Sequence, residues 1–329
     1  MTINLYSVTL YIELPAALTI DKGEFIMNHL RFKGDHYEIG YRWGSLLAGH
    51  GNYILDQVPF PITEERIAFG RQCRPVYEKF FPEILEEIRG LSEGQKSSSE
   101  KLQAVLFSMY AMPPAGHCSC FSVSSKEQLF LGRNSDFLTE IEEFNKNVIY
   151  DFTSDSYGFN GNTTAFLEKC STVDEVIKWL HRIPIASAQT FTVADQRGEI
   201  AVIECCADSI HIQKPEEDQH YVCAVNRFHS PELEKWNTGE IDDWFSRQRY
   251  ETMEKTLSRE APQMDISAAK ELLSGKKGFI CQYDRDTGRD TVWSVIYDLK
   301  HHKTYRAEGN PARCVYQEDQ RVVFQPNKQ

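Results

Sequence analysis

The sequence predicts an α+β fold built from stacked layers of helices and sheets. Residues 27–112 carry apolar side chains mainly at helical spacing, as Val76, Phe80 and Ile84 illustrate. From Cys118 onward the pattern changes to short apolar runs typical of strands, and further helices are interleaved among them. Separate helical and strand regions are typical of α+β proteins, whose helices cover the faces of stacked sheets.

The region before the strands is interpreted as an N-terminal extension, residues 1–26, followed by a short strand and helices. Pro82 marks a helix start or a kink within this region, and Gly90 and Gly94 read as part of a loop. The expected strand covers residues 29–34, and the expected helices cover residues 39–47, 67–91 and 102–110.

The region after residue 117 is predicted to combine strands and helices. Thr172 and Glu175 form a capping box that begins one helix, and residues 195–198 form a hairpin turn. Besides a hairpin over 118–136, the expected strands are 147–152, 189–194, 199–205, 211–213, 221–225, 291–299 and 304–308. The expected helices are 173–182, 246–257 and 266–273.

The hairpin over residues 118–136 is the most informative stretch. Phe121 and Val123 alternate with serines, as in a half-buried strand, and a polar turn leads into a second apolar run. If the two strands pair, Cys118 returns beside Arg133 and Asp136. Positive charge favours a thiolate over a thiol, so Cys118 is a candidate nucleophile. The alternative is a buried cysteine beside a surface ion pair.

Composition excludes several classes of function. The chain has 329 residues, 41% of them hydrophobic, which is enough for a substantial core. Its formal net charge of −12 argues against nucleic acid and anionic membranes as partners, because both attract basic surfaces. We find no apolar run of membrane-spanning length and no basic segment of the kind that begins a signal peptide.

Cysteine usage indicates a reducing compartment. The nine cysteines are odd in number, are irregularly spaced and include no CxxC pair. We therefore predict a cytoplasmic protein with free thiols, in which Cys205 and Cys206 are core residues. His301 and His302 lie in a predicted turn without a third ligand nearby, so neither a metal nor another cofactor is expected.

Several motifs together resemble one family. Cys118-Ser-Cys-Phe followed by Gly132-Arg-Asn-Ser-Asp136 resembles the start of the mature chain in N-terminal nucleophile (Ntn) hydrolases of the choloylglycine hydrolase and acyl-CoA:isopenicillin N acyltransferase type. The acyltransferase-like branch of linear amide C–N hydrolases is the most similar. Further matches follow in order at 161–164, 167–176, 184–190, 194–195, 198–204, 225–226, 244–250 and 281–297, so the resemblance covers most of residues 27–310.

The resemblance implies a fold and a processing event. The fold is an αββα sandwich, two stacked and mainly antiparallel sheets between helical layers. The precursor would cut itself at the His117–Cys118 bond, so that residues 27–117 are a helical pro-segment and residues 118–329 are the catalytic region. The change from helices to strands falls at the same place.

An N-terminal cysteine supplies two groups for amide hydrolysis. Its thiol attacks, and its α-amine serves as the base, because a free α-amine has a pKa of about 7.7–8.0. This chemistry requires no catalytic histidine. It requires cleavage first, because an amide nitrogen cannot act as a base.

The resemblance also assigns the other site residues. Arg133 would stabilise the thiolate, and Asp136 would orient the new α-amine. Asn226 matches the family asparagine whose NH₂ group donates into the oxyanion hole. Arg249 matches an arginine that supports the site. The alternatives are a surface ion pair for Arg133 and Asp136, a strand-end turn residue at 226 and an exposed helix arginine at 249.

Two neighbours of Cys118 need separate interpretation. Cys120 points to the same face of the strand, and the family pattern makes it an ordinary strand residue. His117 suggests a Cys–His dyad, but adjacent strand residues point to opposite faces. We therefore interpret His117 as the residue before the cut.

The chain departs from the family after Phe166. Family members carry additional sequence there, including two sheet strands and a second oxyanion asparagine, for which Asn160 or Asn162 is the only candidate substitute. The absence predicts either an altered enzyme or an inactive derivative, because the missing strands would open one sheet and remove part of the substrate pocket.

Three hypotheses follow. The first is a self-processing amidohydrolase or acyltransferase that acts on a linear amide through a Cys118 thioester. Its partners would be a small-molecule amide, acyl-CoA as an alternative donor and its own cleaved pro-segment, with a homo-oligomer left open. The second is an unprocessed, inactive relative that binds a ligand or partner. The third is a papain-like cysteine hydrolase, whose signature around the cysteine is absent.

Overall fold

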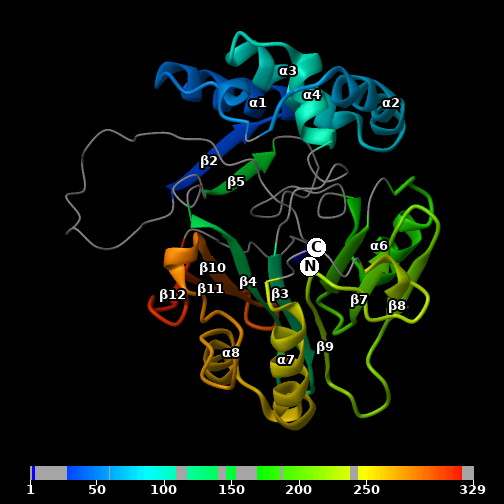
Figure 1. Cartoon of the computed structure of the whole chain (residues 1–329), viewed down its shortest axis with the longest axis vertical. Coiled ribbons are helices and arrows are strands. Elements are labelled where there is room, and N and C mark those ends of the chain that lie inside the picture. The colour runs from blue at the N-terminus through cyan, green and yellow to red at the C-terminus, as the bar shows by residue number, and fades with distance from the viewer. Residues whose placement is uncertain are drawn as a thin grey trace, which may run out of the picture.

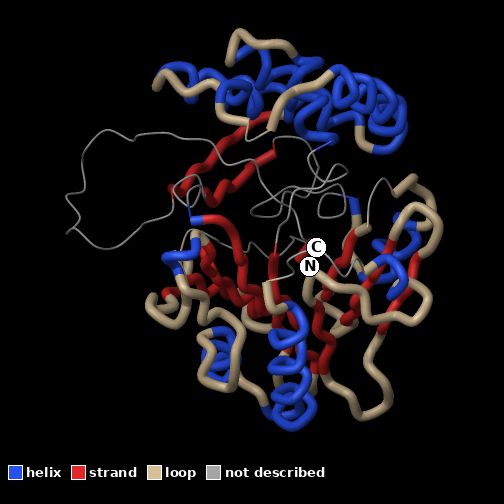
Figure 2. Tube along the Cα trace, viewed as in Figure 1, coloured by secondary structure: helices blue, strands red, loops and turns tan. Residues whose placement is uncertain are grey.

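A computed structural model describes residues 2–3, 28–58, 60–108, 117–139, 146–152, 169–185, 188–237 and 244–320. The fold is α+β, as predicted. In Figure 2 the strands gather in the middle of the molecule, with helices at the periphery. Helices α1 to α4 lie together at one end, and α7 and α8 lie at the other (Figure 1).

The N-terminal helices are α1 (His36–Gly49), α2 (Glu64–Phe80), α3 (Pro82–Gly94) and α4 (Ser99–Ser108). Asp35 forms a capping box with Glu38, which begins α1 three residues before the predicted start. The single helix predicted over 67–91 is two helices, because the residue before a proline avoids the helical conformation. Phe81 is accordingly extended in φ, at −151°, and Pro82 begins α3.

Glycines bring α1 and α3 into backbone contact, and this corrects the predicted loop. Gly90 and Gly94 lie within α3 and face Gly40 and Gly44 of α1. A Cβ atom at Gly44 would lie 2.4 Å from the carbonyl oxygen of Leu91, so a side chain has no room there. The glycines are therefore required by the close approach of two helices rather than by a turn.

The larger sheet has six antiparallel strands and contains the cysteine hairpin. Its order is β12 (Gln317–Glu318), β11 (Lys303–Ala307), β10 (Arg289–Asp298), β4 (Leu129–Leu138), β3 (His117–Ser124) and β9 (Tyr221–Ala224). The predicted hairpin is confirmed. Its two strands occupy the middle of the sheet, where side chains on both faces are buried.

Two smaller sheets complete the strand content of the described residues. One has four antiparallel strands in the order β1 (Thr2–Ile3), β6 (Gln189–Ala194), β7 (Ile200–Cys205) and β8 (Ile210–Gln213). The other pairs β2 (Asn28–Gly34) in parallel with β5 (Lys146–Phe152). The predicted turn over 195–198 joins β6 to β7.

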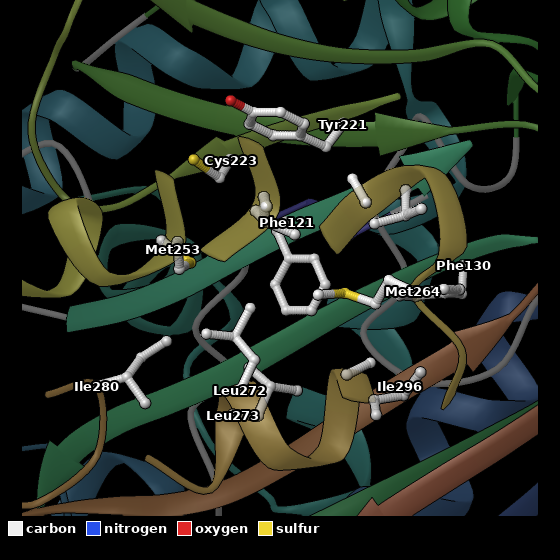
Figure 3. Packing of buried hydrophobic residues seen from close by; sticks show 14 of the residues in the cluster. Phe121, Phe130, Tyr221, Cys223, Met253, Met264, Leu272, Leu273, Ile280 and Ile296 are labelled. Atoms are coloured by element: carbon white, nitrogen blue, oxygen red, sulfur yellow. The ribbon is translucent and has the colours of Figure 1, made fainter. Parts of the chain in front are cut away.

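Three apolar clusters define four layers. Helices α7 (Ser246–Glu260) and α8 (Ile266–Leu273) cover the outer face of the six-stranded sheet. Phe121 and Leu272 belong to the apolar cluster between these helices and the sheet (Figure 3). Cys120, Val202 and Val222 belong to a second cluster between the two sheets. Helix α6 (Val173–Leu180) covers the outer face of the four-stranded sheet.

The layer order is therefore helices, sheet, sheet and helix, which confirms the predicted αββα sandwich. The capping box of Thr172 and Glu175 begins α6 as predicted. Short 3-10 helices occupy Ile54–Asp56, Glu234–Trp236, Ala261–Gln263 and Arg285–Thr287. The place of the missing family segment, together with Asn160 and Asn162, lies outside the described residues.

Candidate active site

The register of the β3–β4 hairpin decides which residues surround Cys118. Cys118 lies opposite Ser135, while Cys120 lies opposite Arg133 and His117 lies opposite Asp136. Opposite residues of an antiparallel pair share a face, and successive residues alternate between faces. Cys118 and Arg133 therefore face the layer between the two sheets, whereas Asp136 faces the helices.

Arg133 contacts the thiol directly. Its Nη2 atom lies 3.2 Å from Sγ of Cys118, and both side chains are buried. The guanidinium also lies over the ring of Trp293, with 4.9 Å from its carbon to the ring centroid. A fixed guanidinium at this distance stabilises negative charge on sulfur. Burial excludes the surface ion pair as an explanation for this arginine.

Asn226 holds the nitrogen of Cys118. The backbone N–H of Cys118 donates to Oδ1 of Asn226 over 2.5 Å. Asn226 follows the end of β9, which is the neighbour of β3 in the sheet. In the continuous chain, therefore, the carbonyl end of this side chain faces the nitrogen that cleavage would free.

Arg249 holds the carbonyl of Cys118 from the opposite side. Its Nη1 atom donates to the Cys118 carbonyl oxygen over 2.7 Å and to Oγ of Ser119 over 2.9 Å. Its Nε atom donates to the carbonyl oxygen of Trp244 over 3.0 Å. The residue is fully buried on α7, so the alternative of an exposed helix arginine is wrong.

Asp136 belongs to a buried network on the helix-facing side of the sheet. It accepts hydrogen bonds from the hydroxyl groups of Thr291 (2.6 Å) and Tyr283 (3.0 Å), and it lies 3.4 Å from Nη1 of Arg249. Burial raises the pKa of Asp136 to about 6, against the opposing effects of these three partners. Asp136 is thus linked to the carbonyl group of Cys118 through Arg249. Because Asp136 is buried, the alternative of a surface ion pair is wrong for this residue as well.

Two residues of this network, Tyr283 and Trp244, received no role from the sequence. Tyr283 donates to Asp136 and, over 3.3 Å, to the carbonyl oxygen of Trp244. Trp244 and Phe245 both have left-handed backbones, with φ of 50° and 59°. Such conformations cost on the order of 1–3 kcal/mol each for bulky residues and persist where the surroundings impose them. Trp244 and Tyr283 fall within the motifs at 244–250 and 281–297, and those motifs are the only sign in the sequence that either residue belongs to the site.

His117 and Cys120 occupy the positions expected of them. The His117 ring stacks on Trp244 at a centroid distance of 4.4 Å, away from the thiol–arginine pair. This arrangement disfavours a Cys–His dyad. Burial raises the pKa of Cys120 to about 11, so that thiol is protonated at neutral pH. Cys205 and Cys206 are buried, as predicted for core residues.

No metal site was identified within the described ranges, where no three His, Cys, Asp or Glu side chains are grouped to hold an ion. His301 pairs with the carboxylate of Asp298 at 2.9 Å. Among the helices that the structure describes, none is both long enough and apolar enough to cross a membrane.

Comparison with family profiles gives a match over part of the chain. The family profile described as acyl-coenzyme A:6-aminopenicillanic acid acyl-transferase matches residues 152–313. The match includes Asn226, Trp244, Arg249 and Tyr283, and it begins after the cysteine hairpin. A search of curated proteins found no match. Together with the α+β sandwich, this match is consistent with the Ntn-hydrolase and acyltransferase-like branch and supports an acyltransferase-like or Ntn-hydrolase-like function.

Proposed function

We propose that the chain cuts itself at the His117–Cys118 bond and then acts on a linear amide through a thioester on Cys118. One observation carries the proposal. Three atoms of Cys118 have polar partners from three separate parts of the chain: Sγ contacts Arg133, the nitrogen donates to Asn226, and the carbonyl oxygen accepts from Arg249. Any buried backbone N–H and carbonyl need partners, but here both partners are polar side chains and a guanidinium contacts the thiol as well.

Self-cleavage uses the thiol and the bond that precedes it. Sγ of Cys118 adds to the carbonyl carbon of His117, the carbon–nitrogen bond breaks, and the thiol proton ends on the nitrogen. The product is a thioester of the His117 carboxyl group with a free α-amine at Cys118. One water molecule then hydrolyses the thioester, which releases the His117 carboxylate and restores the thiol.

The processed site repeats this chemistry on a substrate. The thiol attacks the carbonyl carbon of a small acyl amide while the α-amine accepts its proton and passes it to the leaving amine. The acyl-enzyme is then transferred to water, which gives hydrolysis, or to another amine, which gives acyl transfer. An acyl-CoA can load the same thiol, because its thioester carbonyl is attacked in the same way.

The surrounding residues then have separate roles. Arg133 stabilises the thiolate, and Arg249 anchors the Cys118 carbonyl with Asp136 behind it. Asp136 orients the new α-amine through this network. Asn226 adjoins the reacting nitrogen and, once the bond is cut, turns its NH₂ group toward the oxyanion. Removal of one oxyanion donor typically costs about 10²–10³ in rate.

The test is the mass of the purified protein under denaturing conditions. Wild type is expected to give fragments 1–117 and 118–329, and Cys118→Ala is expected to remain whole. Cys120→Ala is the matched control, because Cys120 lies on the same strand face yet holds a protonated, buried thiol. It is expected to be cut normally.

Activity is measured on acyl amides such as penicillin V, conjugated bile acids and N-acyl amino acids. A wild-type chain that stays whole and cleaves none of them would contradict the proposal and favour the unprocessed binding protein. An uncut chain whose activity depends on a histidine would favour the papain-like mechanism instead.

A further inference from the structure

Beside Cys118, the side chains of His117 and Trp244 form an aromatic pair. The two rings are nearly parallel, with 16° between their planes and 4.4 Å between their centroids. Both side chains are buried, at 3% and 5% exposure. The pair joins the residue on the carbonyl side of the proposed cut to a residue of the loop before α7.

Trp244 is held firmly in this position. Its carbonyl oxygen accepts hydrogen bonds from Nε of Arg249 and from the hydroxyl of Tyr283. Its backbone is left-handed, with φ of 50°, a conformation that persists for a bulky residue only where the surroundings impose it. The Arg289 guanidinium lies 5.2 Å from the indole centroid, and Tyr283 packs edge-on at 5.8 Å. The ring is therefore a rigid surface rather than an adaptable one.

His117 carries the carbonyl group that the thiol must attack. A stacked ring restricts rotation of the whole residue, and with it the direction in which that carbonyl faces Sγ of Cys118. Reactions between neighbouring groups gain rate when the reacting atoms are held in one orientation. Pairing of His117 with Asp136 across the hairpin restrains the backbone, and Trp244 restrains the side chain.

We propose that Trp244 is a positioning residue for self-processing, which acts by stacking on His117 and thereby holding the scissile carbonyl toward the Cys118 thiol. This proposal rests on the proposed function. It assigns to position 117 a requirement for a planar side chain that is independent of any acid–base role of the imidazole.

The experiment follows fragments 1–117 and 118–329 with time after cell-free synthesis of the full chain. His117→Ala is the main variant, because it leaves Trp244 and its hydrogen bonds in place. We expect cleavage to slow about tenfold, which corresponds to about 1.4 kcal/mol of activation free energy. His117→Phe keeps a stacking ring without a titratable group and is expected to cleave within about twofold of wild type.

A double-mutant cycle tests whether the two rings act together. If stacking is the cause, His117→Ala adds little to the loss caused by Trp244→Leu, and Trp244→Phe retains most of the rate. His229→Ala is the matched control. His229 stacks on Tyr250 in the same manner, at 3.7 Å and 17°, but does not adjoin the scissile bond. It is expected to cleave at the wild-type rate.

The possible outcomes separate the two proposals. A wild-type chain that is never cut overturns the proposed function. If wild type is cut and His117→Ala is cut equally fast, the role of Trp244 is overturned and the proposed function stands. Failure of His117→Phe to restore the rate also overturns it, because that result assigns the effect to the imidazole and not to stacking.

Discussion

The side chains around Cys118 divide between the two faces of β3. The thiol and Arg133 lie on the face toward the second sheet, while Asp136 and Arg249 lie toward the helices. Arg249 connects the two sides through the carbonyl group of Cys118. At the scale of single residues, Arg249 and Asp136 are therefore the pair whose removal is most informative.

Arg249→Met is expected to lower the free energy of unfolding by about 3–5 kcal/mol, because it leaves the buried Asp136 carboxylate without its cation. The measurement is urea unfolding in a Cys118→Ala background, in which the chain stays whole. Combining Arg249→Met with Asp136→Asn is expected to recover part of the loss. If the two losses simply add, the pair is not energetically coupled.

The pKa of Asp136 gives a dependence on pH whose sign can be worked out. Because folding raises this pKa from 3.8 to about 6, the folded chain binds the proton more tightly than the unfolded chain. The contribution of this carboxyl to the free energy of unfolding therefore falls as pH rises through that window.

Raising the pH from 4.5 to 7 is accordingly expected to lower the stability of Cys118→Ala relative to Cys118→Ala/Asp136→Asn, by on the order of 2 kcal/mol. Urea unfolding of both proteins at the two pH values measures the difference. A stability difference that does not change with pH would contradict the raised pKa.

At the scale of elements, the contact between α1 and α3 depends on glycine. Gly44→Ala would bring a Cβ atom to 2.4 Å from a backbone oxygen of α3, which only movement of a helix can relieve. We expect a loss of about 1–3 kcal/mol in the free energy of unfolding, measured by urea unfolding.

Gly49→Ala is the control for this substitution. Gly49 ends the same helix, and a Cβ atom there would have no other atom within 4 Å. It is expected to change stability by less than about 1 kcal/mol, in either direction. Equal losses for the two variants would mean that helix propensity, and not the close contact, explains the effect.

At the scale of the whole molecule, several contacts join the two sides of the proposed cut. Strand β2 belongs to the first fragment and pairs in parallel with β5 of the second. Lys169 forms an ion pair with Glu83 across the same division, and Trp179 packs edge-on against Phe80 at 6.1 Å. These contacts are formed by backbone and side chains that the cut does not touch.

Fragments 1–117 and 118–329 are therefore expected to elute together in size-exclusion chromatography and to separate only in denaturant. The measurement combines that elution with a denaturing gel of the same peak. Separate elution of the fragments in native buffer would mean that the helical region leaves after processing and does not remain part of the enzyme.

Local patterns were sufficient to predict most elements and the contact between Arg133 and Cys118. Alternation of apolar residues predicted the hairpin, and the capping box of Thr172 and Glu175 predicted where α6 begins. The order of the motifs predicts the sandwich, and the layers confirm it. The same local signal can have two meanings: glycine predicts a loop at positions 90 and 94, whereas α3 uses both glycines for close packing.

By itself, the sequence determined the strand–turn–strand unit that brings Arg133 to the thiol, because both residues lie within one hairpin. Only the tertiary structure decided that Arg249 is buried, that Asp136 faces the helices and that Tyr283 bonds to it across 147 positions of the chain. The physical reason is the separation along the chain between the residues that must meet. Periodicity and caps report contacts between near neighbours, whereas the site is completed by residues that only the packing of α7 against the sheet brings together.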